Sequence, residues 1–202
     1  MNTQKKAAPN HPINDLIANR WSPYAFSDRP VSKADLQSLF EAARWAPSSY
    51  NEQPWRYIVA SKENAAEFAK VLSCLVEGNQ AWAKAVPVLA LGCTSLNFER
   101  NGTPNAAAVH DLGLGSAQIC FEATNRGLSV HQMIGILPDK ARELFHIPAG
   151  AQAVTGIAIG YAADPNGLPE AMKTRETSPR SRKPLSEFVF SGDWGKAAEI
   201  AK

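Results

Sequence analysis

The chain has 202 residues, of which 45% are hydrophobic and 20% are charged, which suits one packed domain and is too short for two of ordinary size. Its 21 basic and 19 acidic residues nearly balance, so the composition indicates neither a nucleic-acid-binding protein nor attraction to an anionic membrane. We therefore expect a single domain over residues 1–202, and local charge clusters remain compatible with a small anionic ligand.

The N-terminal segment and the cysteines bear on the compartment. Residues 1–12 are polar and contain proline, so we expect a flexible N-terminus and not a signal peptide. No later stretch is long and apolar enough to span a bilayer. Cys74, Cys93 and Cys120 are widely spaced among apolar neighbours, as is typical of buried reduced thiols. These features predict a cytoplasmic protein in which cysteine carries no chemistry.

Helix and strand signals alternate along the chain, which favours α/β or α+β layering. Helices are predicted by apolar spacing, caps and proline over residues 13–19, from the N-cap Ser32 to Pro47, and over 63–73, 105–126 and 138–145. Strands are predicted over residues 55–60, 87–93, 128–135 and 154–161. The run 87–93 is apolar throughout, which predicts a central strand covered on both faces. Two glycines in 154–161 would let another backbone or a ring come close.

The helix predicted over residues 105–126 is the longest periodic stretch. Its buried face is expected to comprise Val109, Leu112, Ser116, Ile119 and Ala123. Gly113 and Gly115 weaken the helix intrinsically, and close packing against a partner helix, as in a homodimer core, would compensate. His110 and Asp111 have no nucleophile beside them, so we interpret the pair as a feature of the helix surface or of an interface.

The C-terminal part is predicted to be less regular. Residues 98–105 and 165–173 lack periodicity and are expected to be irregular. Residues 184–202 are expected to form an extension that packs on a partner subunit, and the apolar run 185–190 suits a strand donated to that partner. Arg180 and Arg182 lie two residues apart, as do Arg20 and Ser22, so each pair shares a side where the backbone is extended. Such pairs suit a phosphate, although a solvated basic surface is the commoner role.

The turn between Pro47 and Trp55 contains two serines, one asparagine and one glutamine. Their hydroxyl and amide groups can direct several hydrogen bonds at one flat polar ligand. The alternative is an ordinary helix-to-strand loop whose serine and asparagine side chains bond to their own backbone.

Several motifs occur in a fixed order: Arg20-x-Ser22, Pro47-Ser48-Ser49-x-Asn51-x-Gln53-Pro54-Trp55, Asn79-Gln80-Ala81-Trp82 before a proline-led strand, a turn at Gly135, and Arg180-x-Arg182. Taken together, this series resembles the FMN-dependent nitroreductase family from about residue 13 to residue 185. The resemblance implies an α+β fold with a mostly antiparallel central sheet flanked by helices. It also implies an intertwined homodimer with two FMN sites at the interface.

The resemblance also implies which residues bind the cofactor. The FMN phosphate and ribityl chain would contact Arg20, Ser22, Arg180 and Arg182, with Trp21 and Tyr24 in the same segment. The neighbouring subunit would supply Pro47, Ser48, Ser49, Asn51 and Gln53. The flavin ring would pass Gln132, Met133, Ile134 and Gly135, where a backbone N–H meets flavin N5. Many relatives carry a basic residue in place of Tyr24, and some carry an acidic residue in place of Ile134.

The activity implied by the resemblance is that of an FMN-dependent oxidoreductase. It would take a hydride from NADH or NADPH and reduce a nitroaromatic, a quinone or a free flavin by ping-pong kinetics, with no side chain as general acid. Three alternatives remain open: a flavin reductase that supplies a separate monooxygenase, a non-catalytic flavin-binding redox sensor, and a helical interaction protein without a cofactor.

Overall fold

The computed structural model describes residues 5–201 and is built around one four-stranded sheet. The strands lie in the order β1 (Trp55–Ser61), β2 (Val88–Ser95), β4 (Ala151–Gly160) and β3 (Ser129–Met133), and every neighbouring pair is antiparallel. The predicted α+β class with an antiparallel central sheet is therefore confirmed.

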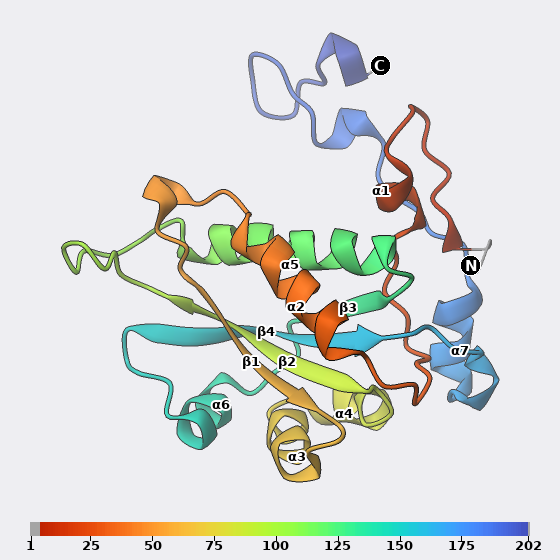
Figure 1. The fold of residues 1–202 in the computed structure, drawn as a ribbon. Helices are drawn as coiled ribbons and strands as arrows, with labels where there is room; N and C mark the ends of the chain where they lie inside the picture. The colour runs from red at the N-terminus through yellow and green to blue at the C-terminus, as the bar shows by residue number, and fades with distance from the viewer. Residues whose placement is uncertain (1–4, 202) are drawn as a thin grey trace.

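Helices cover both faces of this sheet (Figure 1). The helices are α1 (Asp15–Asn19), α2 (Lys33–Arg44), α3 (Ala65–Ser73), α4 (Glu77–Ala83), α5 (Ala108–Asn125), α6 (Pro138–Phe145) and α7 (Glu170–Thr177). Helices α2 and α5 pack on one face, and α3, α4 and α6 pack on the other. Among residues 5–201, no helix combines the length and the apolar character needed to cross a bilayer.

Strand β2 is the centre of the sheet, as its continuous apolar sequence predicts. Seven of its eight residues are buried, because helices cover it on both sides and strands flank it on both edges. On one side Leu89 and Leu91 join a core with α3 and α4, and on the other Val88 and Ala90 join a core with α2 and α5. Two hydrophobic cores therefore hold the sheet between the helix layers.

The glycines of β4 allow the close approach that the sequence predicts. A Cβ built on Gly160 would lie 2.7 Å from the ring of Pro87, and one on Gly156 would lie 2.8 Å from Leu75. Both distances are too short for a side chain, so glycine is required where β4 meets its neighbours.

Helix ends follow local chemistry closely. The Ser32 hydroxyl accepts the backbone N–H of Asp35 at 3.0 Å and begins α2, as predicted. Gly127 follows α5 with a φ of +72°, the left-handed conformation that glycine adopts without strain. Pro138 stands in the first turn of α6. These ends fix where α5 stops and β3 begins.

Two expectations about less regular segments are wrong, and one helix was not predicted. Residues 165–173 are not irregular, because α7 occupies Glu170–Thr177 and its buried Glu176 anchors it to the body. Residues 79–82 belong to helix α4, which the sequence did not predict. Residues 185–190 do not form a strand: 185–187 make a 3-10 turn, and Phe190 makes a single bridge to Ala197.

The buried face of α5 needs one correction. Leu112, Ser116, Ile119 and Ala123 are buried as predicted, whereas Val109 is 47% exposed. Each residue turns a helix by about 100°, so the buried stripe passes through Ala108 and leaves its neighbour outside.

Candidate functional site

The turn that precedes β1 has an unusual backbone. Tyr50, Asn51 and Gln53 have φ angles of +54°, +56° and +51°, the left-handed region that residues other than glycine rarely adopt. Such strain persists only where the surrounding structure fixes it, and it is concentrated at functional sites. Three positive φ angles within four residues therefore indicate that the surrounding structure holds this turn in its conformation, which makes it a candidate functional site.

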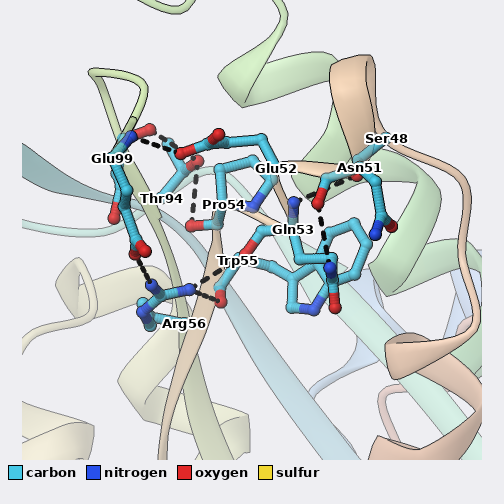
Figure 2. A network of polar contacts seen from close by, with 10 residues as sticks. Ser48, Asn51, Glu52, Gln53, Pro54, Trp55, Arg56, Thr94 and Glu99 are labelled. Carbon is cyan, nitrogen blue, oxygen red and sulfur yellow. Dashed lines mark hydrogen bonds and ion pairs between the residues drawn. The ribbon is translucent and has the colours of Figure 1, made fainter. Parts of the chain in front are cut away.

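Hydrogen bonds inside the turn satisfy much of its polar chemistry (Figure 2). The Gln53 backbone N–H donates to the Ser48 hydroxyl at 3.0 Å, and the Gln53 side-chain amide donates to the Asn51 carbonyl at 2.9 Å. The side chains of Ser48 and Gln53 thus bond to the backbone of their own loop, which is the alternative that the sequence left open. The turn is rigid before any ligand arrives.

Two anchors fix the turn to the body of the protein. The backbone N–H of Ser49 donates at 3.0 Å to the carboxylate of Asp111, which is only 2% exposed. On the other side, Arg56 donates to the carbonyls of Gln53 and Trp55 at 3.0 and 2.8 Å (Figure 2). The expectation that Asp111 is a surface or interface group is therefore wrong, because its carboxylate holds this turn against the first turn of α5, whereas His110 is exposed.

A cluster of three arginines forms a second site. Arg20 donates to the Ser22 hydroxyl at 3.4 Å, as their spacing predicts. Burial lowers the pKa of Arg180, and the nearby guanidiniums of Arg20 and Arg182 lower it further. Among the described residues, none of the three forms an ion pair with a carboxylate. Arg180 therefore has two cationic neighbours and, like them, no carboxylate at ion-pair distance within residues 5–201, which favours the binding of an anion.

A cavity of about 690 Å³ adjoins this arginine cluster at Arg20. Lys6 and Arg29 add positive charge to its wall, and Trp21 and Tyr161 supply aromatic surface. The guanidinium of Arg29 lies 3.9 Å from the centre of the Tyr161 ring. No carboxylate lines the cavity within residues 5–201, although Lys6 forms an ion pair with Asp15 at 3.6 Å, so Arg29 is the wall residue that adds most to the positive potential at Arg20.

The end of β3 forms the third part of the predicted site. The Gln132 side chain donates to the Ser116 carbonyl at 3.1 Å, and Met133 is buried. Ile134 follows with 85% of its surface exposed, so it presents an apolar side chain to the outside.

Gly135 completes this turn and is fixed by α4. The Asn79 side chain donates to the Gly135 carbonyl at 2.9 Å. A Cβ on Gly135 would lie 2.5 Å from Asn79 Nδ2, so the approach requires glycine. Only backbone atoms of Gly135 are left to face a ligand.

Tyr24 and Trp21 lie in the same segment as Arg20, and both contact protein groups, although Trp21 also lines the cavity. The Tyr24 ring packs edge-on against Trp82 and His131, with ring centres 5.3 and 4.8 Å away. The Trp21 ring lies 5.6 Å from the ammonium group of Lys5.

Two of the three parts of the predicted site lie at opposite ends of α5. The turn at residues 48–53 lies at the N-terminal end of α5, and α1, which leads to Arg20, lies near the other end (Figure 1). Asp111 and Thr124, which mark these two places, are separated by roughly 20 Å along the helix. One chain therefore does not bring the turn and the arginine cluster together.

The sequence of residues 17–161 matches the nitroreductase family, which is well over half of the chain. The chain belongs to the nitroreductase family. The predicted family is thereby confirmed.

Relatives in this nitroreductase family extend over most of the chain. A Stenotrophomonas maltophilia protein, provisionally named NADH dehydrogenase/NAD(P)H nitroreductase, is 31% identical over 77% of this chain and 87% of its own length. The Bacillus subtilis FMN reductase (NAD(P)H) is 27% identical over 83% of this chain and 74% of its own length. A crystal structure described as an oxidoreductase containing FMN is 33% identical, with a TM-score of 0.88 over 96% of this chain and 98% of that one.

Sequence reasoning missed three polar residues that shape the site of this nitroreductase. Asp111 carried a signal, because it interrupts the apolar face of α5 one position before Leu112. Lys5 and Glu176 carried none, because both stand in polar segments whose burial depends on contacts between the two ends of the chain. All three side chains act through hydrogen bonds to backbone groups, and the residue type alone does not reveal such a role.

Proposed function

We propose that this nitroreductase uses NADH or NADPH to reduce electron-poor acceptors such as nitroaromatics, quinones or free flavins, with FMN as its bound cofactor and ping-pong kinetics. The observation that supports this most directly is the arginine cluster, in which Arg20 and Arg182 act electrostatically on Arg180 and none of the three pairs with a carboxylate among residues 5–201. FMN, when bound, would supply the hydride-transfer chemistry between the nicotinamide and the acceptor, and the protein would hold and orient it.

The donor set fits the phosphate of FMN. Within residues 5–201, both hydrogen bonds of Arg180 leave from Nη1, so Nε and Nη2 remain to donate to a phosphate. Arg20, Ser22 and Arg182 would complete the cradle, and charge-assisted bonds of this kind are about twice as strong as neutral ones. The fit rests on this surplus of cationic donors.

The flavin ring would lie along the end of β3. Gly135 offers backbone atoms at a position where Asn79 excludes any side chain, and this suits an N–H directed at flavin N5. The exposed Ile134 would give the acceptor side an apolar surface. No side chain is required as a general acid, because water can deliver the proton.

A second copy of the chain would bring the two places along α5 together. In a twofold dimer, the rigid turn of residues 47–53 from one subunit would approach the arginine cluster of the other, which the separation of roughly 20 Å within one chain supports. The C-terminal extension from residue 184 projects from the body and leaves Phe188 and Trp194 exposed, as expected of a segment that packs on a partner (Figure 1).

A flavin reductase that releases reduced flavin to a monooxygenase is the second candidate. The name of the Bacillus subtilis relative supports it. It predicts weak retention of FMN and turnover that depends on added free FMN. A cytoplasmic location is part of the proposal in either case.

A visible absorption spectrum of the purified chain tests the proposal, followed by anaerobic addition of NADPH and then NADH. We expect bound flavin that bleaches rapidly with at least one donor, and parallel lines in double-reciprocal plots of turnover. Bound flavin that stays oxidised would instead indicate a redox sensor. Protein that neither carries nor accepts flavin would contradict the proposal.

A further inference from the structure

Lys5 is a buried cation that fastens the N-terminal segment to helix α7. It is 6% exposed, and its ammonium group donates to the carbonyls of Arg175 and Ser178 at 2.7 and 2.6 Å. These carbonyls lie at the C-terminal end of α7, where a cation also meets the negative end of the helix dipole. Lysine is rarely buried unless such partners are present.

Arg180 makes the reciprocal contact. Its Nη1 donates to the carbonyl of Lys5 at 3.1 Å and to the carbonyl of Ala18 at 3.0 Å. The Ala18 carbonyl also accepts the backbone N–H of Ala7 at 2.9 Å. Each end of the chain therefore binds the backbone of the other through one side chain, and Ala18 in α1 is joined to both.

Glu176 adds a third link, to the segment that follows Arg20. Its carboxylate is 1% exposed and accepts the backbone N–H of Tyr24 at 2.8 Å and that of Ala25 at 3.5 Å. Burial raises the pKa of Glu176, while these two hydrogen bonds and the charge of Lys5 lower it. The segment that carries Arg20 and the segment that carries Arg180 are thus held in one frame.

We propose that Lys5 and Glu176 are positioning residues that hold the Arg180 guanidinium beside Arg20, with Nε and Nη2 directed at a phosphate. We call Lys5, Ala18, Tyr24, Glu176 and Arg180 the terminal clasp. This inference rests on the proposed function, since FMN is the phosphate ligand. Lys5, Glu176 and Arg180 lie outside residues 17–161, so the three side chains that make these contacts come from the parts of this chain that the family match does not cover, whereas Ala18 and Tyr24 lie within it.

The clasp has a consequence for selectivity between two flavins. Riboflavin has the ring and ribityl chain of FMN but lacks the phosphate. A residue that positions the phosphate cradle affects FMN binding and leaves riboflavin binding nearly unchanged, whereas a residue that only stabilises the fold affects both alike. The ratio of the two dissociation constants therefore separates a positioning role from a structural one.

The test measures both dissociation constants by flavin fluorescence on the flavin-free full-length chain, for the wild type, Lys5→Met and Glu176→Gln. The control is Lys62→Met, because Lys62 also donates to a backbone carbonyl, that of Ala85 at 3.3 Å, but from the exposed turn between β1 and α3. We expect Lys5→Met to weaken FMN binding about tenfold and riboflavin binding less than twofold, since one charge-assisted bond contributes about that much. Lys62→Met is expected to change neither.

Equal losses for FMN and riboflavin, or unchanged FMN binding in Lys5→Met, would overturn the inference. If Lys5→Met does not fold, the ratio of the FMN and riboflavin dissociation constants is measured for Glu176→Gln instead. This substitution keeps the shape of the side chain and removes its charge. Wild-type protein that binds neither flavin would contradict the proposed function itself. Wild-type FMN selectivity that survives in both variants would contradict only the clasp.

Discussion

The two ends of α5 differ in whether the polar and charged groups beside them have partners within the chain. At the N-terminal end, the turn at residues 48–53 is strained, and several of its polar groups are paired with Asp111, with Arg56 and with one another. At the other end, the charges of Arg20 and Arg182 act on Arg180, and none of the three pairs with a carboxylate among residues 5–201. We infer that the first region is largely formed in the free chain, whereas the second gains its counter-charge from a bound anion.

This difference indicates that the turn and the arginine cluster contribute differently to ligand binding. A turn fixed in advance loses little conformational freedom on binding, so it can impose shape on a ligand. An unpaired cationic cluster gains the most from a phosphate, so it supplies affinity. We infer that the turn determines how FMN is oriented and that the arginines determine how tightly it is held.

The double variant Arg180→Ala with Arg182→Ala should have the largest effect. Removing two charge-assisted partners of the phosphate is expected to weaken FMN binding roughly 100-fold while the fold persists. Titration of flavin-free protein with FMN measures this. The charge-matched control replaces the exposed Lys33 and Lys84 with alanine and should leave FMN affinity unchanged. Equal FMN affinity in the two double variants would show that Arg180 and Arg182 do not bind the phosphate.

Asp111→Ala tests the other end of α5. It leaves the Ser49 N–H without its charged partner, so the free energy of unfolding should fall by about 2 kcal/mol. Urea denaturation of the flavin-free protein measures the change. His110→Ala, which removes the exposed neighbour, should change stability by less than about 0.5 kcal/mol. If both variants are equally stable, Asp111 does not hold the turn.

A pair of glycines tests the β3 end of the site. Gly135→Ala places a Cβ 2.5 Å from Asn79 and 2.9 Å from Val76, so it should lower the free energy of unfolding by about 1–2 kcal/mol. Gly78→Ala has open space in helix α4 and should stabilise by about 0.5–1 kcal/mol. Thermal unfolding compares them. Equal shifts would show that the turn relaxes around the added methyl group.

The smallest effect concerns His131, which packs against Tyr24 next to the arginine cluster. Burial lowers its pKa below the ordinary value of 6.5, although the carbonyl of Pro23 accepts a hydrogen bond from it at 2.8 Å. The unfolded chain therefore takes up a proton at higher pH than the folded chain does, and stability should fall as the pH drops below about 6.5. His131→Gln should reduce this dependence in urea denaturation at pH 5 to 8. A slope that persists unchanged would assign it to other groups.

Local sequence chemistry predicted much of the fold. Local sequence signals were enough to predict the helix caps at Ser32 and Gly127, because a cap depends on its neighbouring residues. The burial of β2 was predicted in the same way from its apolar run. Helices α4 and α7 were missed because long-range contacts stabilise them: Asn79 bonds Gly135, and Glu176 bonds Tyr24.

The candidate site was predictable as a set of residues and not as an arrangement. The order of the motifs identified the arginines and the polar turn, and those assignments remain predictions until a flavin is bound. Lys5 and Glu176 were absent from the prediction and Asp111 was assigned the wrong role, because each acts on the backbone of a distant segment. Their separations along the chain, such as the 170 residues between Lys5 and Arg175, exceed what any local pattern can encode.

The most direct test of the central claim compares FMN with riboflavin on the flavin-free wild-type chain at low and high salt. If the arginine cluster binds the phosphate, FMN should bind at least roughly tenfold more tightly than riboflavin at low salt, and salt should narrow the difference by screening the charges. Equal affinities at both salt concentrations would contradict the assignment of Arg20, Arg180 and Arg182 to the phosphate.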